Sequence, residues 1–163
     1  MNRYLDRLEQ QRDGVFWLVL YLVRWPVIIP VGYVQGLLAS GVVGASDAWR
    51  PGVGGGALLV PIVVPPIVET LIECTLPYWI LKRLGKIGPA RPWTFILISA
   101  SIMALLHFPV AVPGGFVTGM FLAYGYGHFA TRGHAAAFAY TALYHAAINA
   151  VGVSLYLLSG SQT

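Results

Sequence analysis

The sequence predicts an all-α membrane protein: a polytopic bundle of about five transmembrane helices with an N-terminal interfacial segment. Three observations predict this fold class: an apolar composition, segments of spanning length, and basic residues on one side of the resulting topology. Of 163 residues, 57% are hydrophobic and 10% are charged, whereas an ordinary globular domain carries about 25% charged residues. The mean hydropathy is +0.70. This composition argues against a soluble enzyme, a disordered tail and a disulfide-stabilised secreted module.

The predicted crossings follow from hydrophobic segment length, because a spanning helix needs about 20 mostly apolar residues. Residues 1–24 are predicted to form an amphipathic, interfacial segment, and residues 25–163 the transmembrane domain. The first crossing is expected over 25–43, with Arg24 and Trp25 as an anchor at the membrane surface. The alternative is one long tilted helix from Val15, with the Arg24 side chain reaching back to the interface. The four further segments are 57–81, 93–112, 114–130 and 135–158.

The basic residues predict the orientation of this topology. With five crossings, nine Lys and Arg residues fall on one side of the membrane, and Arg50 in the Pro- and Gly-rich loop 46–56 is alone on the other. Short cytoplasmic loops are enriched in Lys and Arg, so we expect a cytoplasmic N-terminus and an integral protein of a bacterial inner membrane. The cations flank apolar segments. The formal net charge of +4 therefore indicates contact with the lipid bilayer rather than with nucleic acid.

A few polar side chains interrupt the predicted crossings. Glu69 and Glu73 lie in the second, His107 in the third, and His145 and Asn149 in the fifth. A carboxylate at the bilayer centre costs roughly 2.5–3.5 kcal/mol on insertion scales, whereas a polar clamp between helices contributes only about 0.6 kcal/mol per hydrogen bond. A functional site is therefore the favoured interpretation of this set, and a polar clamp is the alternative.

The heights of these side chains along their helices predict that they meet. At 1.5 Å rise per residue, Glu69, His107 and His145 lie about 20 to 24 Å from the cytoplasmic ends of their segments. Residues four apart share a helix face, so Asn149 is expected beside His145, and Glu73 beside Glu69. Prolines in the second crossing leave backbone groups without hydrogen bonds, and a membrane protein tolerates such irregular backbone only where it is buried or lines a cavity. The sequence thus predicts one polar pocket inside the bundle.

Three segments carry a resemblance to a known family. VVPPIVETLIECTLPYWIL, SIMALLHFP and ALYHAAINA resemble the motifs Glu-Glu-x-x-x-Arg, Phe-x-x-x-His and His-x-x-x-Asn of the CPBP family. These are the CAAX-protease and bacteriocin-processing (Abi) intramembrane proteases. The resemblance covers about 58–158. It implies an intramembrane endopeptidase acting on peptides or membrane-protein segments.

The resemblance carries over residue by residue. Glu69 matches the first glutamate, which the family uses as general base, and His107, His145 and Asn149 match their motifs. Three positions depart from the family pattern: Thr70 stands in place of the second glutamate, Cys74 in place of the arginine, and Met103 in place of the phenylalanine. We expect Glu73, one turn from Glu69, to supply the missing carboxyl group.

Peptide hydrolysis needs an activated water and a stabilised oxyanion. Glu69 is the expected general base and acid, His107 would bind the same water, and His145 with Asn149 would donate to the oxyanion. The resemblance implies a reaction without a cofactor. Zinc bound by Glu69, His107 and His145 is the open alternative, because two imidazoles and one carboxylate form a known catalytic zinc set.

Other functions remain open on the sequence. The departures at Thr70 and Cys74 fit a non-catalytic member that acts as a subunit or assembly factor of a larger membrane complex. A haem or chlorophyll bound by His107 and His145 is ranked lower. A transporter is ranked lower still, because the sequence contains no internal repeat.

Overall fold

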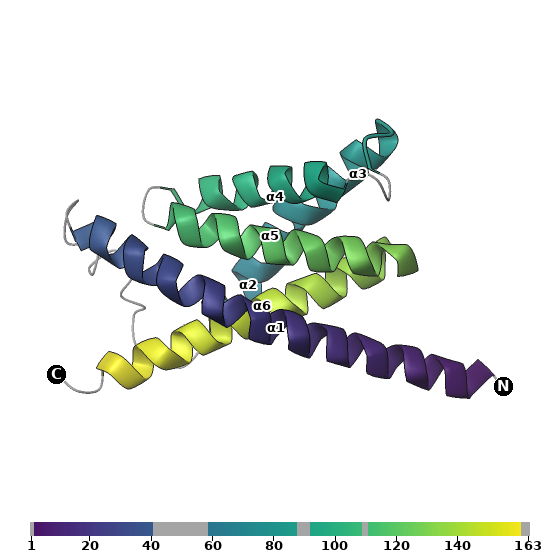
Figure 1. Ribbon diagram of the computed structural model, residues 1–163, viewed down its shortest axis with the longest axis horizontal. Helices are drawn as coiled ribbons and strands as arrows, with labels where there is room; N and C mark the ends of the chain where they lie inside the picture. The colour runs from purple at the N-terminus through teal and green to yellow at the C-terminus, as the bar shows by residue number, and fades with distance from the viewer. Residues whose placement is uncertain (1, 41–58, 88–91, 109–110, 161–163) are drawn as a thin grey trace.

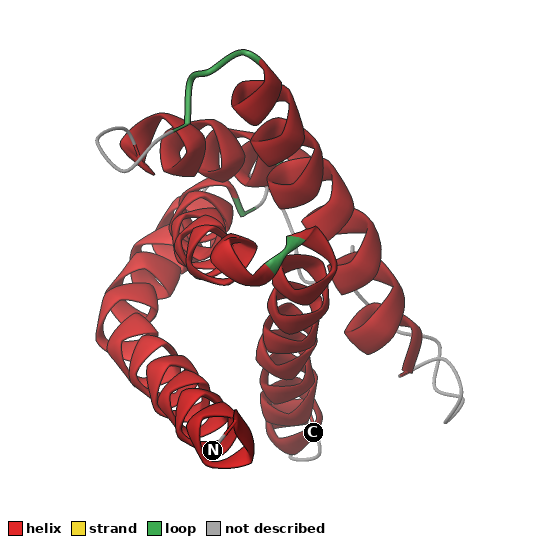
Figure 2. Ribbon diagram, turned by 90° about the vertical axis from the view of Figure 1, so that its right-hand side faces the viewer, coloured by secondary structure: helices red, strands yellow, loops and turns green. Residues whose placement is uncertain are grey.

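The computed structural model describes residues 2–40, 59–87, 92–108 and 111–160. The predicted loop 46–56 lies outside these ranges. The described chain is all-α, as predicted, and contains no strand (Figure 2). Helix α2, the π-helical segment η1 and helix α3 follow one another without a break, so the described residues form five helical units. The elements are α1 (Asn2–Ser40), α2 (Leu59–Glu69), η1 (Thr70–Thr75), α3 (Leu76–Arg83), α4 (Pro92–Leu106), α5 (Val112–Phe129), the short 3-10 segment η2 (Ala130–Arg132) and α6 (His134–Gly160).

Helix α1 is one continuous helix, although Pro26 and Pro30 lie within it. It does not divide near Trp25, where the first crossing was predicted to begin. A single long helix is found, as in the alternative, but it begins at Asn2 rather than at Val15, and Arg24 is buried. The part of α1 that is long and apolar enough to cross a bilayer is Arg12–Tyr33.

Aromatic stacking and one ion pair attach α1 to the rest of the bundle. The ring of Trp17 stacks on Phe129 of α5 with centroids 5.3 Å apart and contacts Tyr144 of α6 at 4.2 Å. Asp13 is 4% exposed and forms an ion pair with Arg132 at the α5–α6 connection. These contacts hold residues 13–17 of α1, well inside the helix, against α5 and α6.

The segment η1 is the irregular part of the second helical unit. Leu76 donates its backbone N–H to the carbonyl of Leu71, five residues earlier, and the Thr75 hydroxyl donates to the carbonyl of Thr70 at 3.3 Å. Pro77 follows directly. A proline has no N–H to donate to the residue four before it, and its ring clashes with that carbonyl. Such a site favours a wider π turn, a form that is frequent at functional sites.

Helices α4 and α5 lie side by side (Figure 1) because α5 has no side chain where they meet most closely. A Cβ atom at Gly119 would lie 2.7 Å from the Cβ of Met103 and 2.8 Å from the Cα of Ala100. A Cβ atom at Gly115 would lie 3.0 Å from the carbonyl oxygen of Met103. The Gly115-x-x-x-Gly119 spacing therefore allows close helix approach, as small residues do in membrane bundles.

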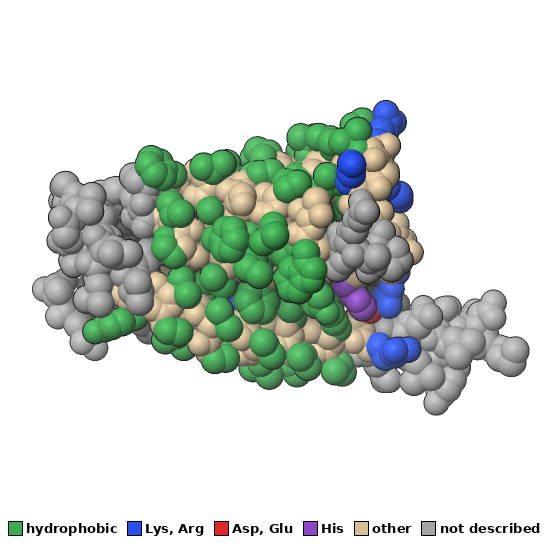
Figure 3. Space-filling model, turned by 45° about the horizontal axis from the view of Figure 1, so that its top comes forward, with side chains coloured by type: hydrophobic (Ala, Val, Ile, Leu, Met, Phe, Trp, Pro, Cys, Tyr) green, Lys and Arg blue, Asp and Glu red, His purple; other side chains and the backbone are tan. Residues whose placement is uncertain are grey.

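The helices pack around η1, which contacts α4, α5 and α6. The start of α1 and the end of α6 lie at opposite ends of the molecule (Figure 1). Hydrophobic side chains cover the middle of the face in Figure 3, and Lys and Arg side chains gather near the end where α1 begins. Exposed basic residues of the described chain include Arg12, Lys82, Arg83, Lys86 and Arg132. By length and composition, α1 and α6 are the two described helices that could cross a bilayer, and α4 is a shorter apolar helix.

The Gly119 contact gives a stability prediction. Gly119→Ala should lower the free energy of unfolding by about 1–3 kcal/mol, because the methyl group overpacks the α4–α5 contact. The matched control is Gly127→Ala in the same helix, where a Cβ meets nothing within 4 Å and the alanine should stabilise the helix slightly. Thermal unfolding of both purified variants measures the difference. Equal melting temperatures would contradict the close approach of α4 and α5.

Candidate active site

A cavity of about 610 Å³ lies between α1, α2, the end of α4 and α6. Most of its wall is apolar. The polar residues of the wall are Arg24, Glu69, His107 and Asn149, and its large apolar residues are Trp25, Ile28, Pro65, Ile148, Val153 and Leu155. Three of the five predicted site residues thus border one cavity. Few convergent polar groups in an apolar wall are typical of ligand-binding sites.

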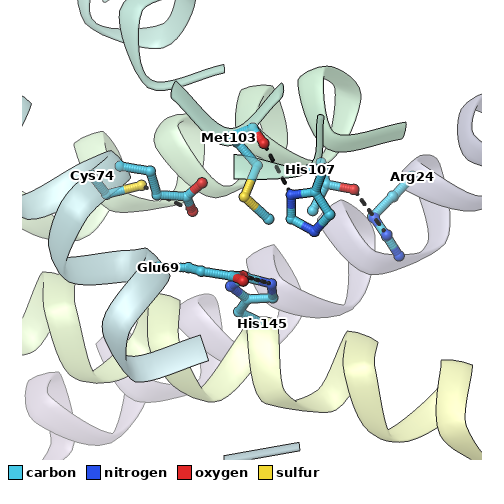
Figure 4. Close-up of polar contacts among 8 residues, drawn as sticks. Arg24, Glu69, Cys74, Met103, His107 and His145 are labelled. Carbon is cyan, nitrogen blue, oxygen red and sulfur yellow. Dashed lines mark hydrogen bonds and ion pairs between the residues drawn. The ribbon is translucent and has the colours of Figure 1, made fainter. Parts of the chain in front are cut away.

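Glu69 and His145 form the polar contact at the centre of the site (Figure 4). The distance from Oε2 of Glu69 to Nε2 of His145 is 3.3 Å. The His145 side chain is 2% exposed, whereas that of Glu69 is 21% exposed. Nε2 of His145 can therefore donate to a carboxylate that is itself open to the cavity. His145 is not part of the cavity wall, so this contact orients the Glu69 carboxyl group from the side away from the cavity.

His107 presents one defined nitrogen to the site. Its Nδ1 lies 2.9 Å from the backbone carbonyl oxygen of Met103. A carbonyl oxygen only accepts, so Nδ1 carries a proton and donates. In the neutral ring Nε2 is then a hydrogen-bond acceptor. In Figure 4 the imidazole of His107 extends from the end of α4 towards the Glu69–His145 pair.

His145 and Asn149 lie one turn apart on α6 and take different positions. Asn149 borders the cavity, whereas His145 lies behind Glu69 and is not part of the cavity wall. His145 therefore contacts the Glu69 carboxyl group, and Asn149 borders the cavity. Their four-residue spacing places both on one face of α6. The side-chain amide of Asn149 has two N–H donors and one acceptor, which suits a group that binds a substrate carbonyl.

Glu73 does not share the cavity with Glu69. It is fully buried, and the thiol of Cys74 donates to its Oε1 with a distance of 3.7 Å. The wider turn of η1 starts directly after Glu69, so the four-residue spacing does not place both carboxyl groups on one face. Glu73 is absent from the cavity wall, but its carboxyl group lies close enough to that of Glu69 for their charges to interact. Its contribution of a second carboxyl group to the site stays a prediction. Glu73 faces the core beside Cys74.

Arg24 is the site residue that sequence reasoning missed. It was predicted to anchor α1 at the membrane surface, but it is 5% exposed and lies in the cavity wall. Its Nη2 donates to the hydroxyl of Thr118 on α5 at 3.2 Å (Figure 4). The available signal was its place near the middle of the apolar stretch Arg12–Tyr33, since a charged residue inside such a stretch indicates function.

Zinc binding would need Glu69, His107 and His145 to converge on one point. Among the described residues, no three His, Cys, Asp or Glu side chains are grouped closely enough to hold a metal ion. The hydrogen bond to Met103 also leaves Nε2 as the only available ligand atom of His107. The ligand set that zinc requires is thus not assembled in the part of the chain that the structure describes.

The arrangement can perform acid–base chemistry on a small molecule held in the cavity. The Glu69 carboxylate accepts a proton, His107 Nε2 accepts a hydrogen bond, and Asn149 and Arg24 provide N–H donors from other parts of the wall. A bound water needs two to four polar partners, and Glu69 with His107 supplies two acceptors. The N–H donors of Asn149 and Arg24 suit a carbonyl oxygen that gains negative charge.

The Glu69–His145 contact gives a second stability prediction. Glu69→Ala leaves Nε2 of the buried His145 without an acceptor and should lower the free energy of unfolding by about 1–3 kcal/mol. Glu69→Gln retains an oxygen that accepts the hydrogen bond, so it should melt closer to the unaltered protein. Thermal unfolding of the two variants in the same lipid compares them. Identical loss of stability in both would contradict a stabilising contact.

Comparisons of the chain with protein-family models, with curated proteins and with solved structures find no match. A function can therefore be argued only from the sequence and from the geometry of the cavity residues.

Proposed function

We propose that this chain is an integral membrane endopeptidase that hydrolyses a peptide bond with a water activated by Glu69. One observation carries the proposal: a carboxyl group borders a largely apolar cavity, is held by a buried imidazole at 3.3 Å, and shares the cavity with a second imidazole. The order of the three motif-like segments, each on its own helix, supports the same chemistry. The substrates would be hydrophobic peptides or segments of membrane proteins.

The outer surface supports a location in a bilayer. Only 11% of an apolar 18-residue window within Arg12–Tyr33, and 33% of such a window within His134–Leu155, is buried inside the molecule. Large hydrophobic side chains face outward on every helix: Leu18 is 58% exposed, Leu105 is 72% exposed and Leu143 is 69% exposed. A soluble protein seldom exposes contiguous apolar surface of this extent, whereas lipid tails cover it without cost. The basic end in Figure 3 fits the cytoplasmic surface of a bacterial inner membrane.

The proposed reaction uses the cavity groups in order. The Glu69 carboxylate takes a proton from the water whose other contact is Nε2 of His107, and the water oxygen attacks the peptide carbonyl carbon. The carbonyl oxygen becomes an oxyanion that Asn149 stabilises by N–H donation. Glu69 then gives its proton to the nitrogen of the leaving amine as the C–N bond breaks. His145 fixes the carboxylate throughout.

The departures from the family pattern support a second candidate, a non-catalytic subunit of a larger membrane complex. Thr70 stands at the position of the family's second glutamate and Cys74 at that of its arginine. Both side chains are fully buried, so neither presents a charged group to the cavity. The retained Glu69–His145 contact favours the enzyme over this candidate. A stable partner that co-purifies with the chain, with no effect of Glu69→Gln, would favour the subunit.

Loss of the general base tests the enzyme directly. Glu69→Gln should lower the cleavage rate by about 10²–10⁴-fold, because the amide cannot accept the proton from water. His145→Ala should also lower the rate strongly, because the carboxylate loses its orientation. Mass spectrometry of membrane peptides from cells that express each form identifies uncut peptides that accumulate with Glu69→Gln. Ser154→Ala is the matched control on α6, because the exposed Ser154 hydroxyl donates only to the Ala150 carbonyl. Cleavage retained in both site variants would exclude this reaction.

The membrane location has its own test by spin labelling. In a Cys74→Ala background, a label at Leu143→Cys should collide with oxygen more often than with a water-soluble nickel complex, because Leu143 would face lipid. A label at Lys86→Cys should show the reverse, because Lys86 lies at the exposed basic end. Power-saturation measurements in lipid vesicles compare the two positions. Equal nickel accessibility at both would contradict a membrane-spanning bundle.

A further inference from the structure

Arg24 is the cavity residue that the proposed reaction leaves without an essential role. Its side chain is 5% exposed and lies in the same wall as Glu69 and His107. One nitrogen donates to the Thr118 hydroxyl at 3.2 Å, whereas Nε is buried and has no hydrogen-bond partner. A guanidinium has five N–H donors, so one neutral hydroxyl does not satisfy it.

None of the carboxylates whose positions the structure describes forms an ion pair with Arg24. Asp13 lies eleven residues earlier on the same helix, about 16 Å away along its axis, and is paired with Arg132. Glu69 is paired with His145, and Glu73 faces Cys74 in the core. A buried charge without a partner costs several kcal/mol. An anionic group in the cavity would remove this cost.

The depth of Arg24 indicates which anion fits. It lies about 18 Å from Arg12 and about 14 Å from Tyr33 along α1, near the middle of the apolar stretch. The hydrocarbon layer of a bilayer is about 30 Å thick, so lipid phosphates lie far above and below this level. Among the described residues that line the cavity, Arg24 is also the only Lys or Arg. A single guanidinium matches the two oxygens of one carboxylate.

We propose that the cavity selects hydrophobic peptides that carry a carboxylate, and that Arg24 binds this carboxylate while the scissile bond lies at Glu69. This inference deepens the proposed peptidase function and rests on it. The apolar wall, with Trp25, Ile28 and Ile148, contacts the peptide side chains. The carboxylate is either the C-terminus of the peptide or an Asp or Glu side chain, since both present the same pair of oxygens.

The test is a binding measurement that does not depend on cleavage. The full chain with Glu69→Gln is placed in phosphatidylcholine nanodiscs and titrated with three peptides: acetyl-Leu-Ala-Leu-Ala-Leu with a free C-terminus, the same peptide as a C-terminal amide, and the amide with its central Leu replaced by Glu. At least one carboxylate peptide should bind about 10- to 100-fold more tightly than the neutral amide, the range expected for a hydrogen bond to a charged group.

Variants of Arg24 test whether this residue causes the difference in binding between the carboxylate peptides and the neutral amide. Arg24→Gln should remove the preference, Arg24→Lys should keep part of it, and Lys86→Gln, which alters an exposed cation away from the cavity, should leave it unchanged. Preference for the free terminus alone identifies the chain end, and preference for the Glu peptide alone identifies a side chain.

Equal binding of all three peptides, or a preference that survives Arg24→Gln, would overturn the inference. Tighter binding of dodecyl phosphate than of dodecanoate would overturn it in favour of a phosphate ligand. Cleavage that persists with Glu69→Gln would instead count against the proposed reaction at Glu69, so the two failures are distinct.

Discussion

The contact between Glu69 on α2 and His145 on α6 is the constraint on which the site depends. Around it, most side chains of the cavity wall are apolar, and polar groups in such surroundings require hydrogen-bond partners. Nε2 of His145 and Oε2 of Glu69, 3.3 Å apart, provide one such contact across two helices. The contact therefore positions α2 against α6, and it leaves the second carboxyl oxygen of Glu69 available to the cavity.

The all-α class and the positions of most helices follow from the sequence, because long apolar segments separated by basic or glycine-rich stretches have few other structures. The prediction that Glu69, His107 and His145 lie at similar heights along their helices is consistent with the 3.3 Å contact of Glu69 with His145 and with the shared cavity of Glu69 and His107. Such a prediction is possible because the rise per residue of a helix is nearly constant. The position of Glu73 does not follow from the same rule. Pro77 favours a π turn that begins after Glu69, and a rule for regular α-helices cannot describe a face beyond that turn.

Arg24 illustrates a different reason for an incomplete prediction. Hydropathy alone indicates that a charge interrupts an apolar segment, and it favours a membrane surface as the place for that charge. The actual partner is the Thr118 hydroxyl, 94 residues later in the chain. A contact between helices so distant in sequence depends on how α1 packs on α5, through Trp17 and Phe129. No local pattern around Arg24 contains that information.

Hydrolysis inside an apolar bundle requires that water be bound as firmly as the substrate. The same low-polarity wall that favours a hydrophobic peptide disfavours free water, so the water must donate hydrogen bonds to fixed acceptors. The bond from His107 Nδ1 to Met103 fixes the acceptor nitrogen of that ring, and His145 fixes the acceptor oxygen of Glu69. Arg24, which also lies in the cavity wall, has N–H donors and no acceptor. In the proposed reaction, the acceptors of Glu69 and His107 would bind water and remove its proton, whereas the N–H donors of Asn149 and Arg24 would bind negative charge. A hydrolytic step needs both kinds of group.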